Sequence, residues 1–298
     1  MESSKVKIWA LGDGIALAAA MGFGGLCFLG RYLYTLGDIT QSVLWASVTA
    51  VLLFVFADGA ARLKRTNRNF TICLIFEVIF VFLFVGVVLY SVFFDFSHYF
   101  VVMGQKAEIQ HKLVKNITQA EAMFVEYEKY TEKRKESYKR YLKSVADPDA
   151  KAMRPSEYAG VFDTSSGIGD EKQIEEEIFI INAELYPSDY NTMKQEATSW
   201  LAKARNNVET WNAMGIVDVV NEVEKSKEWL SALVELSAKA KRQKNEQVNN
   251  FVYGFTIDDV KERFETHGKP TLWSIGLAVI LVTLMLLYYI VSPRSARL

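Results

Sequence analysis

Residues 70–94 read FTICLIFEVIFVFLFVGVVLYSVFF, the most hydrophobic stretch of the chain. A helix needs about 20 apolar residues to cross a bilayer, and this stretch carries a single charged residue, Glu77. No proline interrupts it, so the backbone hydrogen bonds of a helix can all be made in lipid. The stretch therefore predicts a membrane-spanning helix.

Three further stretches, at residues 8–30, 39–57 and 272–291, are also long and apolar enough, or nearly so, to cross a bilayer. All five prolines of the chain lie outside the four stretches. We therefore expect four transmembrane helices.

The charged residues are segregated along the chain. Residues 96–270 hold 25 of the 34 Lys and Arg and 29 of the 35 Asp and Glu. This pattern excludes a soluble globular enzyme and predicts three regions: three spans in 1–95, a polar domain in 96–270, and the fourth span with a short tail in 271–298. The net charge of −1 gives no basic excess, so we expect no nucleic-acid partner.

Basic residues near the spans predict the orientation in the membrane. The loop between the second and third spans carries one acid, Asp58, against four basic residues, Arg62, Lys64, Arg65 and Arg68. Loops rich in Lys and Arg stay in the cytoplasm. We therefore expect a multi-pass protein of the bacterial inner membrane with both termini inside and residues 96–270 in the periplasm.

The polar domain shows helical periodicity and no sustained alternation of period 2, so we expect an all-α fold with an extracytoplasmic helical bundle. Residues 102–145 predict one long helix that continues out of the third span. Thr131 and Arg134 interrupt its stripe, which favours a packed bundle helix over a pure coiled coil. The stripe consists of Ile117, Ala120, Phe124, Tyr127, Thr131, Arg134, Tyr138, Tyr141 and Val145.

The rest of the domain is divided by turn and cap signals. Residues 146–169 are rich in Pro, Gly, Ser and Asp and predict a loop. Asp170 with Gln173 matches a capping box. Further boundaries are expected at Pro187 and Ser188, at Gly215 before a helix over about 216–250, and at Thr256 before a short segment.

No catalytic or cofactor motif is present in the sequence. Phosphate-binding, dinucleotide-binding, zinc-protease and nucleophile-elbow patterns are all missing, so we expect no enzyme activity, no cofactor and no metal. His98 and His267 flank the third and fourth spans. A shared metal or proton site is one interpretation of this pair, and two unrelated surface histidines is the preferred one.

Three acids, Glu77, Asp13 and Asp58, fall in or beside the spans on the predicted cytoplasmic side. Intramembrane ionisable groups are candidates for function, and these three would suit a cation or proton path. The preferred interpretation is that they pair with Lys64, Arg65 or Arg68, or with one another while protonated. Glu77 is the deepest and the best single candidate for function.

The first span carries small residues at i, i+4 spacing, which lets helix backbones approach closely in a membrane. The partner of this face is either another span of the chain or a second subunit. The face consists of Gly14, Ala18 and Gly22, with a parallel stripe of Ala16, Ala20 and Gly24.

The basic loop at 62–68, the Phe-rich span at 70–94 and the helix that emerges at about residue 102 together resemble the layout of TssN. TssN is the multi-span inner-membrane component of the type VI secretion systems of Bacteroidetes. The resemblance implies membership of a trans-envelope complex that anchors a contractile injection machine. It carries no functional residue over to this chain.

Spans, a helical outer domain and little cytoplasmic mass favour a scaffold or anchor subunit of a trans-envelope assembly. Its expected partners are other envelope proteins, bound through the outer domain, and the lipid bilayer, and we expect it to form an oligomer. One alternative is a membrane sensor or regulator that signals through a partner. Another is a small ion channel that uses Glu77.

Overall fold

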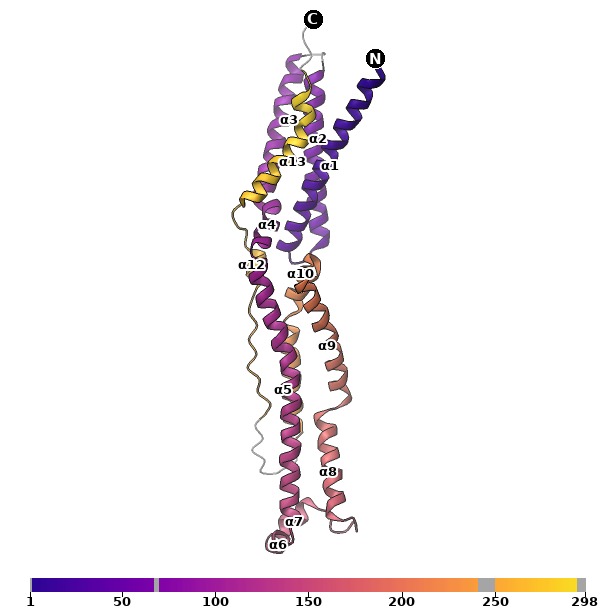
Figure 1. The fold of residues 1–298 in the computed structure, drawn as a ribbon, viewed down its shortest axis with the longest axis vertical. Coiled ribbons are helices and arrows are strands. Elements are labelled where there is room, and N and C mark those ends of the chain that lie inside the picture. The colour runs from indigo at the N-terminus through magenta and orange to yellow at the C-terminus, as the bar shows by residue number, and fades with distance from the viewer. Residues whose placement is uncertain (1, 67–69, 241–249, 294–298) are drawn as a thin grey trace. The chain divides into compact units, whose positions relative to one another are not determined.

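The computed structural model describes residues 2–66, 70–240 and 250–293. The fold is all-helical, with 84% helix and no strand in the part of the chain that the structure describes (Figure 1). This confirms the all-α prediction. The chain divides into two compact units, which are described separately.

The first unit comprises Met1–Lys112, Trp211–Asn221 and Asp259–Leu298. Its elements are α1 (Glu2–Tyr34), α2 (Ile39–Arg65), α3 (Phe70–Ser91), the π-helix η1 (Val92–Phe96), α4 (Ser97–Gly104), α10 (Ala213–Glu222), α12 (Lys261–Glu265) and α13 (Leu272–Val291).

Four helical segments of this unit are long and apolar enough to cross a membrane, as the sequence predicts. They are Gly12–Tyr34, Ile39–Arg65, Phe70–Gly104 and Leu272–Val291. The third is longer than predicted, because α3 continues without a break through η1 and α4 instead of ending near residue 94.

The spans pack through one apolar core. Phe23 of α1, Leu53 of α2, Phe84 of α3 and Met285 of α13 are all buried in it. Small residues bring α1 close to α2, since a Cβ added to Gly24 would lie 2.9 Å from the Cβ of Ala50 and 3.0 Å from the carbonyl oxygen of Ala46.

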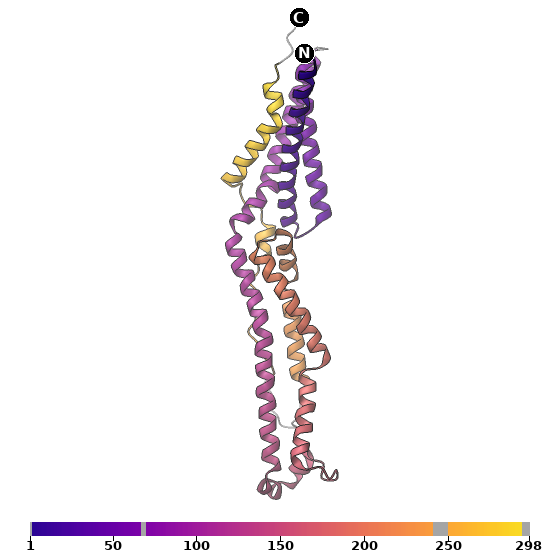
Figure 2. The ribbon, with the colours of Figure 1, turned by 45° about the vertical axis from the view of Figure 1, so that its right-hand side comes forward.

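The second unit comprises Leu113–Thr210 and Glu222–Asp258. Its long helix α5 lies alongside α8 and α9 in both views (Figures 1 and 2). The elements are α5 (Lys106–Ala146, which begins in the first unit), α6 (Pro148–Met153), α7 (Pro155–Val161), α8 (Asp170–Leu185), α9 (Ser188–Glu209) and α11 (Lys225–Lys239).

Two apolar clusters hold this unit together along α5. In one, Leu142 of α5 packs with Ile181 of α8. In the other, Tyr127 of α5 packs with Ala197 of α9 and Leu233 of α11. The helical stripe of the sequence is thus the inner face of a bundle, as predicted.

The two polar residues in that stripe are buried and hydrogen-bonded. Thr131 donates to the carbonyl oxygen of Glu128 at 2.8 Å and also pairs with the hydroxyl of Tyr186. Arg134 donates to the carbonyl oxygens of Ser237 and Ala240 at the end of α11. There it satisfies C-terminal carbonyls that have no partner within the helix.

Several predicted boundaries differ from the structure. The region 146–169 contains α6 and α7, each with proline in its first turn, where the missing N–H costs nothing. Gln173 does not complete a capping box, because its amide donates to the carbonyl oxygens of Asp163 and Ile168 and orders the turn before α8.

The predicted helix over about 216–250 is wrong in two respects. Gly215 lies inside α10, and the preceding break falls at Trp211, whose φ is +56°. The helix then stops again between Glu222 and Lys225, and α11 ends at Lys239. The end predicted at 250 adjoins residues 241–249, which lie outside the described part of the chain. The short segment expected from Thr256 forms a helix only at α12, Lys261–Glu265.

Candidate functional site

Glu77 is buried, and it is hydrogen-bonded to another span. The hydroxyl of Tyr289 on α13 donates to its carboxylate at 2.8 Å. The carbonyl oxygen of Tyr289 in turn accepts a 2.7 Å hydrogen bond from Lys64 of α2. The Glu77 carboxylate therefore joins α3 to α13, and α13 is joined to α2.

The other two candidate acids, Asp58 and Asp13, lie on α2 and α1. Asp58 forms an ion pair of 2.8 Å with Arg62, one helical turn further along α2. Asp13 is half-buried on α1. The carboxylate of Asp58 is thus paired with a basic residue of its own helix, Arg62, which is not one of the partners expected from the sequence.

The basic residues after the second span have further partners on α13. Arg65 donates to the hydroxyl of Tyr288 and lies against its ring, and Lys64 lies over the ring of Tyr289 at 4.6 Å. Arg68 lies outside the described residues. Lys64 and Arg65 therefore fix the end of α13 as well as contributing positive charge.

The small-residue face of the first span is mostly uncovered by the residues that the structure describes. Gly14 and Ala18 are exposed, a Cβ on Gly14 would meet nothing within 4 Å, and a Cβ on Gly22 would touch only Leu281 at 3.9 Å. The close contact with α2 uses the parallel stripe at Ala20 and Gly24 instead.

A second polar cluster lies at the opposite ends of the same spans. We call Arg31, Tyr34, Asp95, His98 and His267 the histidine cluster. Its members come from α1, from η1, from α4 and from the connection between α12 and α13.

The two histidines lie together, with ring centroids 5.3 Å apart. The ring of Tyr34 packs on both, at 4.1 Å from His267 and 5.7 Å from His98. His98 is 1% exposed. The preferred interpretation of two unrelated surface histidines is therefore wrong, because packing of α4 against the α12–α13 connection brings the rings into contact.

An ion pair on the π-helix accompanies the histidines. Asp95 is buried, and Arg31 of α1 donates to its carboxylate at 3.5 Å. π-Helical turns insert an extra residue into a helix and occur often at functional sites. Here the turn directs a carboxylate toward α1.

Gly30 makes this approach possible. A Cβ at that position would lie 1.7 Å from the carbonyl oxygen of Asp95, far inside contact distance. The backbones of α1 and η1 therefore meet at this glycine, which directly precedes Arg31.

Several polar atoms of the histidine cluster are buried without a hydrogen-bond partner among the described residues. They are both ring nitrogens of His98, Nε2 of His267 and Nε of Arg31. The backbone of Phe264 approaches His98 but does not reach hydrogen-bond geometry. Buried polar groups without partners are rare in proteins and call for an explanation.

Burial also affects the acidity of His267, which lies outside the spans. It lowers the pKa of this imidazole, the carboxylate of Asp95 opposes the effect, and the guanidinium of Arg31 adds to it. His267 therefore holds a proton less readily than a solvated histidine.

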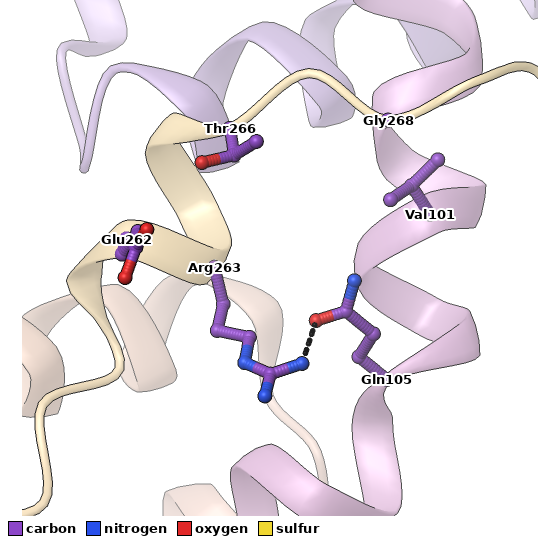
Figure 3. Close-up of a pocket in the computed structure, with 6 residues that line it drawn as sticks. All are labelled: Val101, Gln105, Glu262, Arg263, Thr266 and Gly268. Atoms are coloured by element: carbon purple, nitrogen blue, oxygen red, sulfur yellow. Dashed lines mark hydrogen bonds between the residues drawn. The ribbon is translucent and has the colours of Figure 1, made fainter.

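A pocket of about 300 Å³ adjoins the cluster (Figure 3). Its lining includes Thr266 and Gly268, the two neighbours of His267, together with Val101 and Gln105, and Gly268 lies beside Val101. Arg263 of α12 extends along it and donates to the side-chain oxygen of Gln105 at 2.9 Å.

Sequence reasoning missed Arg31 and Asp95. Each is a single charged residue at the end of an apolar stretch, which is also the usual pattern for a solvated helix end. Within the described ranges, no group of three or more His, Cys, Asp or Glu residues is arranged to hold a metal ion.

The chain matches no family model, no curated protein and no solved structure. The function must therefore be argued from its own residues.

Proposed function

We propose that this protein is a non-enzymatic scaffold subunit of an inner-membrane assembly. In this proposal the four apolar helices cross the membrane with both termini in the cytoplasm. Residues 96–270 lie in the periplasm, where their helices bind other envelope proteins.

The main support for the proposal is the length and position of helix α5. This helix of 41 residues begins in the unit that holds the spans and continues into the helical unit. At 1.5 Å per residue it is about 60 Å long. The two units are thus connected through a helix and not through a Gly/Ser-rich linker, which suits a subunit that binds partners through its helical unit.

The geometry of Glu77 supports a scaffold over a small channel. Its carboxylate accepts a hydrogen bond from Tyr289, and Asp58 pairs with Arg62. These acids serve contacts between or within helices, whereas an ion path needs carboxylates that face a shared polar passage.

The surface of the helical unit offers contacts for a protein partner. Phe179 on α8 is 74% exposed and Met153 on α6 is 82% exposed, and aromatic residues and methionine are enriched in protein–protein interfaces. The layout shared with TssN favours a secretion machine as the assembly.

Affinity purification from gently solubilised native membranes, followed by mass spectrometry, tests the proposal. We expect other envelope proteins at fixed stoichiometry, and reduced recovery with Phe179→Asp. A matched Glu175→Lys variant on the exposed surface of the same helix controls for a general change of charge. Recovery of the chain alone, as a symmetric oligomer, would contradict the scaffold and favour a channel.

A further inference from the structure

We propose that His98 and His267 form a proton-binding site, which holds one proton between the two imidazoles. When it is occupied, the site draws the carboxylate of Asp95 away from Arg31 and loosens the contact of α1 with η1.

The spacing of the rings supports a shared proton. At a centroid separation of 5.3 Å, two imidazoles can form a hydrogen bond when one nitrogen of each ring points toward the other ring. A neutral imidazole offers one donor and one acceptor, and an imidazolium offers two donors. A protonated ring can therefore donate to the neutral one.

The site can bind a proton because several of its ring nitrogens have no hydrogen-bond partner. Both ring nitrogens of His98 and Nε2 of His267 are buried without partners among the residues described. A proton taken up from solvent turns one of these nitrogens into a donor, and the neighbouring ring supplies the acceptor. Proton binding thus makes the hydrogen bond between the two rings a charge-assisted one, which is about twice as strong as a bond between neutral rings.

The charges around the rings limit the site to one proton. The charged groups that act on the imidazoles are Asp95 from η1, Arg31 from α1 and the two histidines themselves. Tyr34 contributes an uncharged ring from α1, and α12 contributes the backbone of Phe264. Two imidazolium ions at this distance, beside a guanidinium, would repel one another.

His267 is the ring that carries the proton. It is less buried than His98, and the carboxylate of Asp95 acts on it favourably. Burial lowers the pKa of His267, so the proton is taken up below the ordinary imidazole value of about 6.5.

The ion pair between Arg31 and Asp95 should weaken when His267 is protonated. Arg31 reaches Asp95 only at 3.5 Å, a long distance for a charge-assisted hydrogen bond. A positive charge on His267 competes with Arg31 for this carboxylate. Since Arg31 is on α1 and Asp95 on η1, a weaker ion pair loosens the contact between these two elements.

Histidine NMR of the full chain in nanodiscs tests the site, because the chain has only three histidines. The third, His111, is exposed and serves as an internal reference. We expect His267 to titrate below the ordinary imidazole value of about 6.5. His98→Leu removes the acceptor and should lower the proton affinity of His267 about tenfold, whereas His111→Gln should not change it.

Hydrogen exchange provides the second measurement, and it does not depend on the His98 variant folding. With intrinsic rates taken into account, exchange in residues 28–36 should rise several-fold on acidification across the His267 transition, and this rise should be lost in His267→Gln. A titration of His267 that is unchanged by His98→Leu would overturn the proposal, as would equal acid-induced exchange in wild type and His267→Gln. Neither result depends on which proteins bind the chain, so the scaffold proposal is tested separately.

Discussion

The hydroxyl of Tyr289 donates a 2.8 Å hydrogen bond to the buried carboxylate of Glu77. Loss of this donor leaves a buried acceptor with one partner fewer, which costs about 1–3 kcal/mol. We therefore expect Tyr289→Phe to lower the thermal stability of the purified protein. Tyr90→Phe, at an exposed tyrosine of α3, is the matched control and should have little effect.

Glu77→Gln should retain both stability and assembly, because its side-chain oxygen can still accept from Tyr289. The measurements are thermal unfolding and co-purification of partners. Intact assembly combined with loss of ion conductance would instead support the channel alternative for Glu77.

Gly30→Ala should destabilise the first unit severely. The added Cβ would lie 1.7 Å from the carbonyl oxygen of Asp95, and backbone has to shift to make room. We expect a loss of about 3 kcal/mol or more, measured by thermal unfolding. Gly25→Ala, where a Cβ meets nothing within 4 Å, should be neutral or slightly stabilising. Equal behaviour of the two variants would show that α1 and η1 are not in close contact.

Arg134→Ala should destabilise the second unit, because the carbonyl oxygens of Ser237 and Ala240 lose a buried charged donor. Removal of one partner from a buried charged contact costs about 3 kcal/mol. Denaturant unfolding of the full chain measures this loss. Arg140→Ala, on the exposed side of the same helix, should change stability by less than about 0.5 kcal/mol.

Glu222 predicts a specific acid dependence. Hydrogen bonds from Lys225 and from the indole of Trp200 lower the pKa of this carboxyl. Because the folded pKa lies below the unfolded one, the stabilisation is present above the unfolded value of about 4.3 and is lost as pH falls through the folded value.

Glu222→Gln should therefore be less stable than wild type at pH 7, by less than about 1 kcal/mol because the carboxylate is partly exposed, and the difference should vanish in acid. Denaturant midpoints at pH 7 and pH 3 measure it. A difference of equal size at both pH values would show that the charge of Glu222 does not contribute.

The proposed topology predicts which cysteines an impermeant reagent can reach. In a background with Cys27 and Cys73 replaced by serine, Ser165→Cys should react with an impermeant maleimide in intact spheroplasts. Thr66→Cys, equally exposed in the structure, should react only after permeabilisation. The reverse pattern would contradict the N-in orientation.

The spans and the bundle helices could be predicted from the sequence because hydropathy and periodicity determine them. The stretch at 70–94 leaves no alternative to a buried or membrane helix. The prediction that the stripe along α5 faces the core was also correct. Thr131 and Arg134, the two polar residues in the stripe, face inward as well. These two positions look unfavourable in the sequence because their partners, Tyr186 and Ala240, are far away along the chain.

The histidine cluster could be predicted only in part. His98 and His267 flank two spans, which indicates that both lie near one end of the spans, but nothing local brings their rings together. The contribution of Asp95 depends on the π-turn at Val92–Phe96, and no turn or cap residue marks such a turn in the sequence. The helix boundary predicted at Gly215 was wrong for a related reason. The break falls at Trp211, which adopts a left-handed conformation that nothing in the neighbouring sequence indicates.

The π-helix η1 has a consequence for how this segment can change in evolution. Each residue of an α-helix turns the chain by about 100°, so the extra residue in the turn sets which side of α4 faces α12. Insertion or deletion of one residue between Val92 and Phe96 would rotate His98 away from His267. The number of residues in this stretch, more than their identity, therefore keeps the two imidazoles in register.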